Sequence, residues 1–290
     1  MMVAAVGVFS WRAALALPWE WEPGIVAPVA LAGILYAVGS RRVHTAGKDG
    51  PGPWNVAAFW AGWTTVVISL LSPLHPLSEQ LFWMHMVQHE LLMTVAAPLL
   101  VLGRPLAVCV EALPGSWRAA ALHTWRSPGV ARSWRTATRP LDAWLMHGAA
   151  IWLWHAPVLF DAALRSDPIH ALQHVAFLGT ALLFWEALLY GRSHSAAAGL
   201  GIIYLFTTAV HTGALGALMT FARSPWYPTY ADRALAWGFT PLQDQQLAGL
   251  IMWIPASVAY LIAALVLAAR WLRESDGAAD LSAINVAVQP

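Results

Sequence analysis

The chain has few charged residues and a single cysteine, and both scarcities limit what it can be. Charged side chains make up 11% of its 290 residues, whereas hydrophobic residues make up 59%. Soluble domains carry about 25% charged residues, so the composition indicates a polytopic membrane protein. Cys109 has no second cysteine to pair with, which excludes an internal disulfide and a Cys-x-x-Cys metal site. The 11 histidines must therefore supply most ligands of any bound metal.

Several catalytic signatures are also missing. The sequence contains no GxSxG, Walker-type or dinucleotide-binding loop, no HExxH and no Ser/His/Asp arrangement. The apolar stretch 1–18 has no basic segment before it, so it does not resemble a cleaved signal peptide.

Seven apolar stretches predict an all-α membrane protein. Each is close to the roughly 20 residues that a helix needs to cross a bilayer. They are Pro23–Val38, Trp54–Leu71, Gln80–Leu102, Leu141–Phe160, His170–Tyr190, Leu200–Phe221 and Gln243–Ala269. The predicted organisation is an outer N-terminal segment at 1–22, a seven-helix membrane domain at 23–270 and a cytoplasmic tail at 271–290.

The basic residues predict the topology. Twelve of the 16 fall on alternate connections, namely Arg41, Arg42, Lys48, Arg104, Arg118, Arg126, Arg132, Arg135, Arg139, Arg192, Arg270 and Arg273. Cytoplasmic loops are rich in Lys and Arg, which places the N-terminus outside and the C-terminus in the cytoplasm. The connection 103–140 carries tryptophans among its arginines, which is typical of an amphipathic segment at lipid headgroups rather than of a nucleic-acid-binding one. We expect the outer loop 222–242 to be structured.

Six histidines on four of these spans share a similar depth in the outer half of the membrane. Counting about 1.5 Å per residue from the outer end of each span gives this set: His85, His89, His155, His170, His174 and His211. Two HxxxH pairs each place both rings on one helix face. Because ionisable groups in hydrocarbon need partners, the six are predicted to converge. His147 lies deeper, and the remaining histidines, His44, His75, His123 and His194, are predicted to be solvated, although His75 could feed a site.

Imidazole binds copper, zinc and iron, and thioethers favour Cu(I), so copper is the leading metal. Met93, at i+8 from His85, and Met252 are predicted as secondary ligands. Asp244 is predicted as a secondary ligand or entry residue. Glu90 is predicted to order His89 or relay a proton.

Three other interpretations remain open. Paired axial histidines would suit a haem protein, although six crowded histidines argue against it. A dinuclear oxidoreductase would use Glu90 or Asp244 as a base or bridging carboxylate. In a purely structural bundle the histidines would only hydrogen-bond one another.

Five segments, in order, resemble the CtaG-type cytochrome c oxidase assembly factors, a seven-helix bacterial membrane family. They are HMVQHELLMTVAAPLLVLGRPL, LWHAPVLFDAAL, HALQHVAFLGTALLFW, HTGALGALMTFARSPWYPTY and LQDQQLAGLIMWIP. The resemblance spans about residues 81–269, and it departs at Glu90, where an apolar residue is expected. It implies a multi-pass protein of the bacterial plasma membrane that delivers or handles copper for haem–copper oxidases. Its expected partners are oxidase subunits or copper chaperones.

Overall fold

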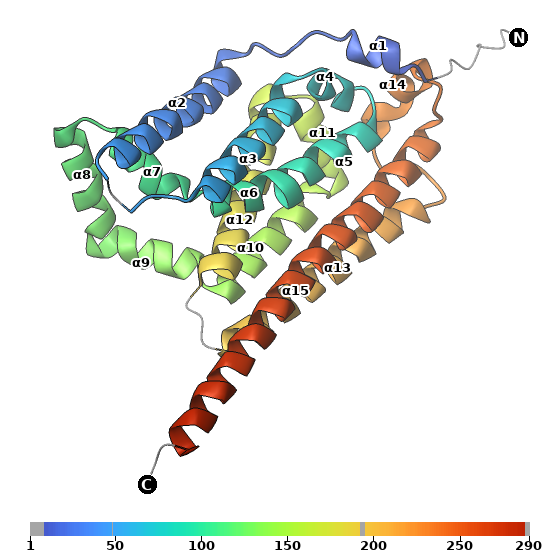
Figure 1. Ribbon diagram of the computed structural model, residues 1–290. Helices are drawn as coiled ribbons and strands as arrows, with labels where there is room; N and C mark the ends of the chain where they lie inside the picture. Colours follow the sequence, from blue (N-terminus) through green and yellow to red (C-terminus); the bar gives the residue numbers. More distant parts are fainter. Residues whose placement is uncertain (1–8, 48, 192–194, 288–290) are drawn as a thin grey trace, which may run out of the picture.

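The computed structural model describes residues 9–47, 49–191 and 195–287, and every regular element in these ranges is helical (Figure 1). The elements are α1 (Trp11–Leu15), α2 (Pro23–Thr45), α3 (Pro53–Leu71), α4 (Leu74–Ser78), α5 (Phe82–Glu90), η1 (Leu91–Ala96), α6 (Ala97–Leu102), α7 (Pro105–Ala112), α8 (Gly115–Arg126), α9 (Pro128–Ala137), α10 (Pro140–Trp154), α11 (Pro157–Leu164), α12 (Asp167–Tyr190), α13 (Ser195–Thr220), η2 (Pro228–Tyr230), α14 (Ala231–Ala236) and α15 (Pro241–Ala287). The all-helical prediction is confirmed for these residues.

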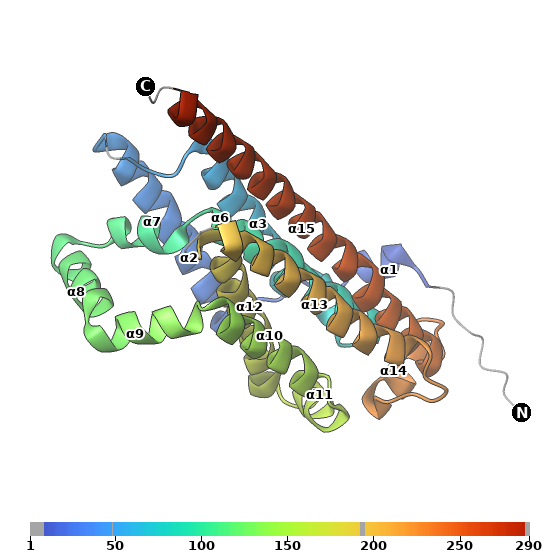
Figure 2. The ribbon, with the colours of Figure 1, turned by 90° about the horizontal axis from the view of Figure 1, so that it is seen from below.

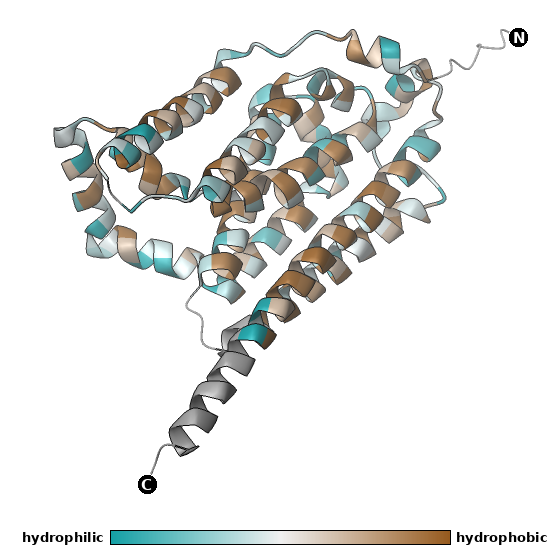
Figure 3. Cartoon of the chain, in the orientation of Figure 1, coloured by the Kyte–Doolittle hydropathy of each residue, from teal (hydrophilic) through white to brown (hydrophobic). Residues whose placement is uncertain are grey.

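Six helical stretches within the described ranges are long and apolar enough to cross a membrane. They are Pro23–Thr45, Pro53–Leu71, Phe82–Leu102, Asp167–Tyr190, Gly199–Thr220 and Pro241–Arg273. Large apolar side chains such as Ile34 and Leu265 are 60% and 61% exposed, as lipid-facing residues are. Figure 3 shows apolar residues along the lengths of α2, α13 and α15. The membrane class is thus confirmed, while the count of seven spans and the orientation stay predictions. The first span is longer than predicted, because its helix continues to Thr45.

The fourth predicted span, Leu141–Phe160, is wrong as a continuous helix. α10 ends at Trp154 and α11 begins at Pro157. Proline disfavours helical geometry in the residue before it, and Ala156 is extended, with φ −62° and ψ 128°. His155 is the C-cap residue of α10 at this break.

The third predicted span is a composite of α5, the π-helical segment η1 and α6. Pro98 accounts for the irregularity, since it has no N–H to give to the carbonyl four residues earlier. Trp185 of α12 donates from Nε1 to the carbonyl oxygen of Met93 at 2.9 Å, which satisfies an acceptor inside η1. π-Helical turns are frequent at functional sites.

The start of α5 is fixed by a carboxylate from another helix. Asp244, in the first turn of α15, is fully buried. Its two oxygens accept hydrogen bonds from the backbone N–H groups of Phe82 at 2.9 Å and Trp83 at 3.0 Å. The first N–H groups of a helix have no partner within the helix, so Asp244 caps α5 from a distant point in the sequence.

α13 lies beside the N-terminal part of the longer α15 (Figures 1 and 2). Their contact depends on two glycines: a Cβ on Gly216 would lie 2.7 Å from the carbonyl oxygen of Gly249. Small residues allow this close backbone approach, as is common between membrane helices. The pair forms one wall of the bundle, against which α5 packs.

The connection between α6 and α10 contains α7, α8 and α9. Arg42 of α2 donates to the carbonyl oxygens of Glu111 and Leu113, which holds α7 against α2. α8 and α9 contain no buried residue, and Trp117 is 69% exposed. Figure 2 shows both helices extending away from the bundle. This exposure fits the predicted membrane-surface segment.

Candidate metal centre

Five of the six predicted histidines come together in the bundle. Their ring centroids are separated by 4.2 Å for His85 and His89, 5.2 Å for His85 and His170, 4.4 Å for His170 and His174, 5.5 Å for His89 and His174, and 6.3 Å for His89 and His155. None of the five side chains is more than 7% exposed. We call this set the imidazole cluster.

Local sequence explains how three helices aim these rings at one another. The i, i+4 spacing of His85 and His89 puts both on one face of α5, and that of His170 and His174 does the same on α12. His155 enters from the break between α10 and α11, because Pro157 ends the helix there. Phe160 and Phe177 pack against the rings, with centroids 5.0 Å from His85 and 4.5 Å from His89.

The cluster contains buried nitrogen atoms that have no hydrogen-bond partner. They are His85 Nε2, His89 Nδ1, His89 Nε2, His170 Nε2 and His174 Nε2. An unsatisfied buried polar atom costs about 1–3 kcal/mol, and native proteins contain few of them. Five in one place therefore need a common explanation, and a bound cation supplies one.

The tautomer of His85 follows from its neighbours. Tyr230 donates its hydroxyl proton to the carbonyl oxygen of Ser78 at 2.7 Å. Burial raises the pKa of the Tyr230 hydroxyl well above its usual value, so the proton stays in place. The hydroxyl oxygen can then only accept from His85 Nδ1, 3.1 Å away. The lone pair of His85 is thus on Nε2, one of the unpartnered atoms.

The prediction that His75 is solvated is wrong. Its side chain is 7% exposed, and its ring stacks on His170 with centroids 5.4 Å apart. α4 folds the short loop back over the bundle and carries the ring inward. By contrast, His44 and His123 are exposed as predicted, and His194 lies outside the described residues.

In the described part of the chain, one group of at least three His, Cys, Asp or Glu residues has potential ligand atoms that all lie within 4.8 Å of one another. It consists of His75, Glu79 and His170. We call it the mouth triad. Burial lowers the pKa of His75, against the opposing charges of Glu20 and Asp167. Burial also raises the pKa of Glu79, an effect that Arg233 opposes.

One hydrogen bond weakens the mouth triad as a ligand set. Gln88 Nε2 donates to the carbonyl oxygen of Ser69 at 2.7 Å and to His75 Nδ1 at 2.9 Å. A neutral His75 that accepts at Nδ1 carries its proton on Nε2. That proton would have to move before Nε2 could bind an ion, so the imidazole cluster is the stronger candidate.

His211 and His147 lie apart from the cluster. Trp152 donates from Nε1 to His211 Nδ1 at 3.3 Å, and the ring of Trp144 lies 5.9 Å from that of His211. His147 contacts Thr180, with Nδ1 and Oγ1 3.1 Å apart. Within the described residues, no ring contact joins either histidine to the imidazole cluster.

Among the described residues, the two predicted carboxylates, Glu90 and Asp244, make no hydrogen bond to a ring of the imidazole cluster. Both ring nitrogens of His89 lack a hydrogen-bond partner, so the prediction that Glu90 orders His89 is wrong. Glu90 is itself buried, with an unpartnered Oε2. Each oxygen of Asp244 accepts a backbone hydrogen bond, which gives this residue a structural role at the start of α5.

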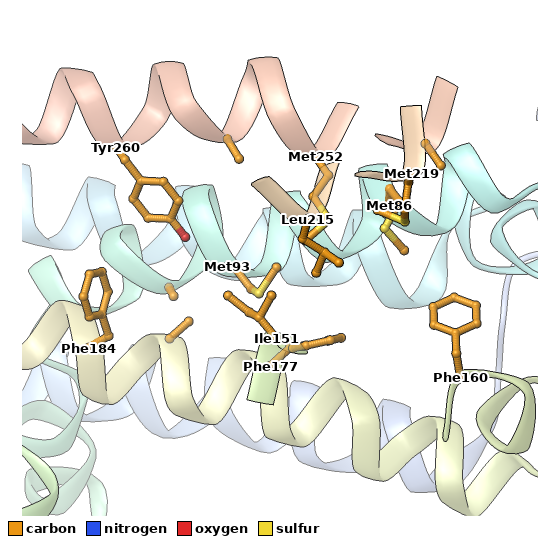
Figure 4. Packing of buried hydrophobic residues seen from close by; sticks show 14 of the residues in the cluster. Met86, Met93, Ile151, Phe160, Phe177, Phe184, Leu215, Met219, Met252 and Tyr260 are labelled. Carbon is orange, nitrogen blue, oxygen red and sulfur yellow. The ribbon is translucent and has the colours of Figure 1, made fainter. Parts of the chain in front are cut away.

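The predicted methionines belong to the apolar core. Met93 lies beside Ile151 and Phe177, and Met252 lies beside Leu215 (Figure 4). The placement of Met93 at i+8 from His85 assumed a continuous α-helix, and η1 changes the number of residues per turn at that point. Met86 belongs to the same apolar core, and its Sδ lies 3.5 Å from His155 Nε2.

The comparisons with known proteins identify the family of the chain. A model of the cytochrome c oxidase caa3 assembly factors (Caa3_CtaG) matches residues 34–274. The chain belongs to this family. The predicted family resemblance is therefore confirmed, and with its spanning helices the chain is a multi-pass protein of the bacterial plasma membrane.

Uncharacterized protein ML1998 of Mycobacterium leprae (strain TN) is 26% identical to this chain over an alignment of 277 positions, which covers 88% of the chain and 40% of the relative. The chain thus spans about two fifths of the length of this curated relative. No solved structure matches the chain significantly.

Sequence reasoning gave no ligand role to His75, Glu79 or Met86, although it allowed that His75 could feed a site and counted Met86 among the methionines nearby. His75 and Glu79 share the i, i+4 spacing of the other pairs, and that spacing was an available signal. Met86 carried no comparable signal, because its contact with His155 joins two helices distant in sequence.

Proposed function

We propose that this assembly factor binds copper as cargo in the imidazole cluster and passes it on during maturation of cytochrome c oxidase. The observation that supports this most is the convergence of five buried rings, four of which carry unpartnered nitrogens. Neutral imidazole is the form that binds metals, and a buried, crowded cluster favours it over the charged form.

The donor set favours copper over other metals. Imidazoles bind several transition metals, but the thioether of Met86 beside His155 adds a soft ligand that favours Cu(I). The ring centroids of neighbouring cluster histidines are only 4.2 to 6.3 Å apart. A haem could therefore enter only by displacing several of the rings. Among the described residues, neither Glu90 nor Asp244 hydrogen-bonds to a cluster ring, so a dinuclear oxidoreductase would lack the carboxylates predicted for it as base or bridge.

The imidazole cluster has more donor atoms than one copper ion needs, which would allow the ion to be transferred by ligand exchange. Adjacent rings along α5 and α12 can replace one another as ligands, so copper can move within the cluster without being free in the membrane. The mouth triad shares His170 with the imidazole cluster, and the ring of its His75 lies 5.9 Å from that of His174. Glu20 and Asp167 add negative charge near His75. Such charge attracts cations, which suits a point of entry or exit on the outer side. An oxidase subunit or a copper chaperone would exchange copper there.

Copper content tests this proposal. Purified wild-type protein is expected to retain copper, whereas His85→Ala and His174→Ala are each expected to lower the copper per chain, because each removes a ring from the centre of the cluster. Elemental analysis of detergent-purified protein measures the ratio. His123→Ala, which changes an exposed histidine, is the control and should match wild type. Unchanged copper in both cluster variants would refute the proposal.

A further inference from the structure

The contact between His155 and Met86 has an unusual arrangement of electron pairs. His155 Nδ1 lies 2.6 Å from the carbonyl oxygen of Ile151, and a carbonyl can only accept. His155 Nδ1 therefore carries the proton, and the lone pair of the neutral ring is on Nε2. That lone pair faces Met86 Sδ at 3.5 Å, and the sulfur is also only an acceptor.

Two acceptors that face each other in a buried site do not form a hydrogen bond. A doubly protonated His155 would remove the conflict, but it would place a charge where His155 is 3% exposed and Met86 1% exposed, without a carboxylate partner. A cation held by both atoms resolves the conflict without that charge on the ring. Typical metal–nitrogen and metal–sulfur distances of about 2.0 and 2.3 Å at a tetrahedral angle give a nitrogen–sulfur separation of about 3.5 Å.

A third donor is available on the same helix. His89 follows Met86 by three residues on α5, so the two side chains are neighbours on its surface. Both nitrogens of His89 are buried and unpartnered, and its ring centroid lies 6.3 Å from that of His155. The backbone of His155 is held in place by Tyr227, whose hydroxyl donates to the His155 carbonyl oxygen at 2.8 Å.

We propose that Met86, His89 and His155 form a site selective for the cuprous ion within the imidazole cluster. This inference rests on the proposed copper function and specifies the oxidation state and ligands. All three ligands are neutral, so a monovalent ion brings one net charge into the apolar bundle and a divalent ion brings two. The desolvation of an ion grows steeply with its charge, and the thioether adds a preference for the softer ion. Zn²⁺ and Cu²⁺ are therefore disfavoured at these three residues.

The test compares Met86→Leu with Met93→Leu under anaerobic conditions. Both substitutions conserve volume at a buried position of the third predicted span. Cu(I) affinity of the full chain in detergent is measured by competition with bathocuproine disulfonate, and copper-edge X-ray absorption reports whether sulfur is a ligand. Zn²⁺ affinity is measured in parallel by competition with a chromophoric chelator.

Wild type is expected to show a sulfur neighbour of copper. Met86→Leu is expected to lose that sulfur signal and to bind Cu(I) at least about tenfold more weakly. Replacing a residue that only positions a metal ligand already lowers affinity about tenfold or more, so loss of a ligand itself should cost at least as much. Its Zn²⁺ affinity should change by less than this, and Met93→Leu should match wild type throughout. A sulfur signal that survives Met86→Leu, or disappears in Met93→Leu, would overturn the assignment.

The wild-type spectrum distinguishes the two proposals and does not depend on whether a variant folds. Copper bound with nitrogen neighbours alone would refute the Met86 site and leave the cluster intact. Wild-type protein that binds no Cu(I) would refute both.

Discussion

Replacing Asp244 by alanine is expected to destabilise the protein more than any other single substitution of a predicted site residue. The change removes both acceptors of the Phe82 and Trp83 N–H groups in a fully buried position. Each unsatisfied donor costs about 1–3 kcal/mol, so a loss of roughly 2–6 kcal/mol is expected. The start of α5, which carries His85 and His89, loses its anchor. Unfolding of the detergent-solubilised protein, followed by circular dichroism or limited proteolysis, measures the effect.

Asp244→Asn separates capping from metal binding. Asparagine keeps one acceptor oxygen, so it should retain part of the stability that alanine loses. Asp232→Ala changes an exposed aspartate in the first turn of α14 and should be close to neutral. If Asp244→Ala were as stable as wild type but bound less copper, Asp244 would be a ligand and the capping account would be wrong.

Replacing His85, His89 and His174 together by alanine is expected to abolish the proposed contribution of this protein to oxidase maturation. The triple variant removes four of the five unpartnered nitrogens. In a bacterium whose oxidase depends on this protein, oxidase activity and oxidase-bound copper should fall to the level of a strain that lacks the gene. Haem bound to the oxidase should fall less, because the cluster is proposed to supply copper alone.

The matched control for this experiment is a chain with His44→Ala and His123→Ala. Both residues are exposed, so the control changes histidine content without touching the cluster. It should support oxidase maturation fully. Normal oxidase in cells that carry the triple variant at wild-type abundance would mean that the family's function does not pass through these rings.

Local periodicity was enough to predict much of the cluster. The HxxxH pairs on α5 and α12 follow from helix geometry alone, and the two pairs do meet. Depth was also predictable, since residues rise regularly along a helix. Direction was not. Counting from the end of a span placed His211 at a suitable height, but α13 turns that ring toward Trp152 of α10.

The other differences come from breaks in helical regularity. Pro157 turns the fourth span into two helices, and the rule for residues before proline could have indicated this. Met93 lies in the π-helical segment before Pro98, so the i+8 spacing from His85 no longer places the two residues on one helix face. His75 was assigned to solvent because it lies in a short connection, whereas α4 packs that connection onto the bundle. Such packing depends on contacts between segments distant in sequence, which local patterns do not encode.

The most direct test of the central claim is anomalous X-ray scattering at the copper edge from crystals of the copper-loaded protein. The account predicts an anomalous peak enclosed by the rings of His85, His89, His155, His170 and His174. A crystal with no copper peak there, or with copper only at exposed histidines such as His123, would contradict it.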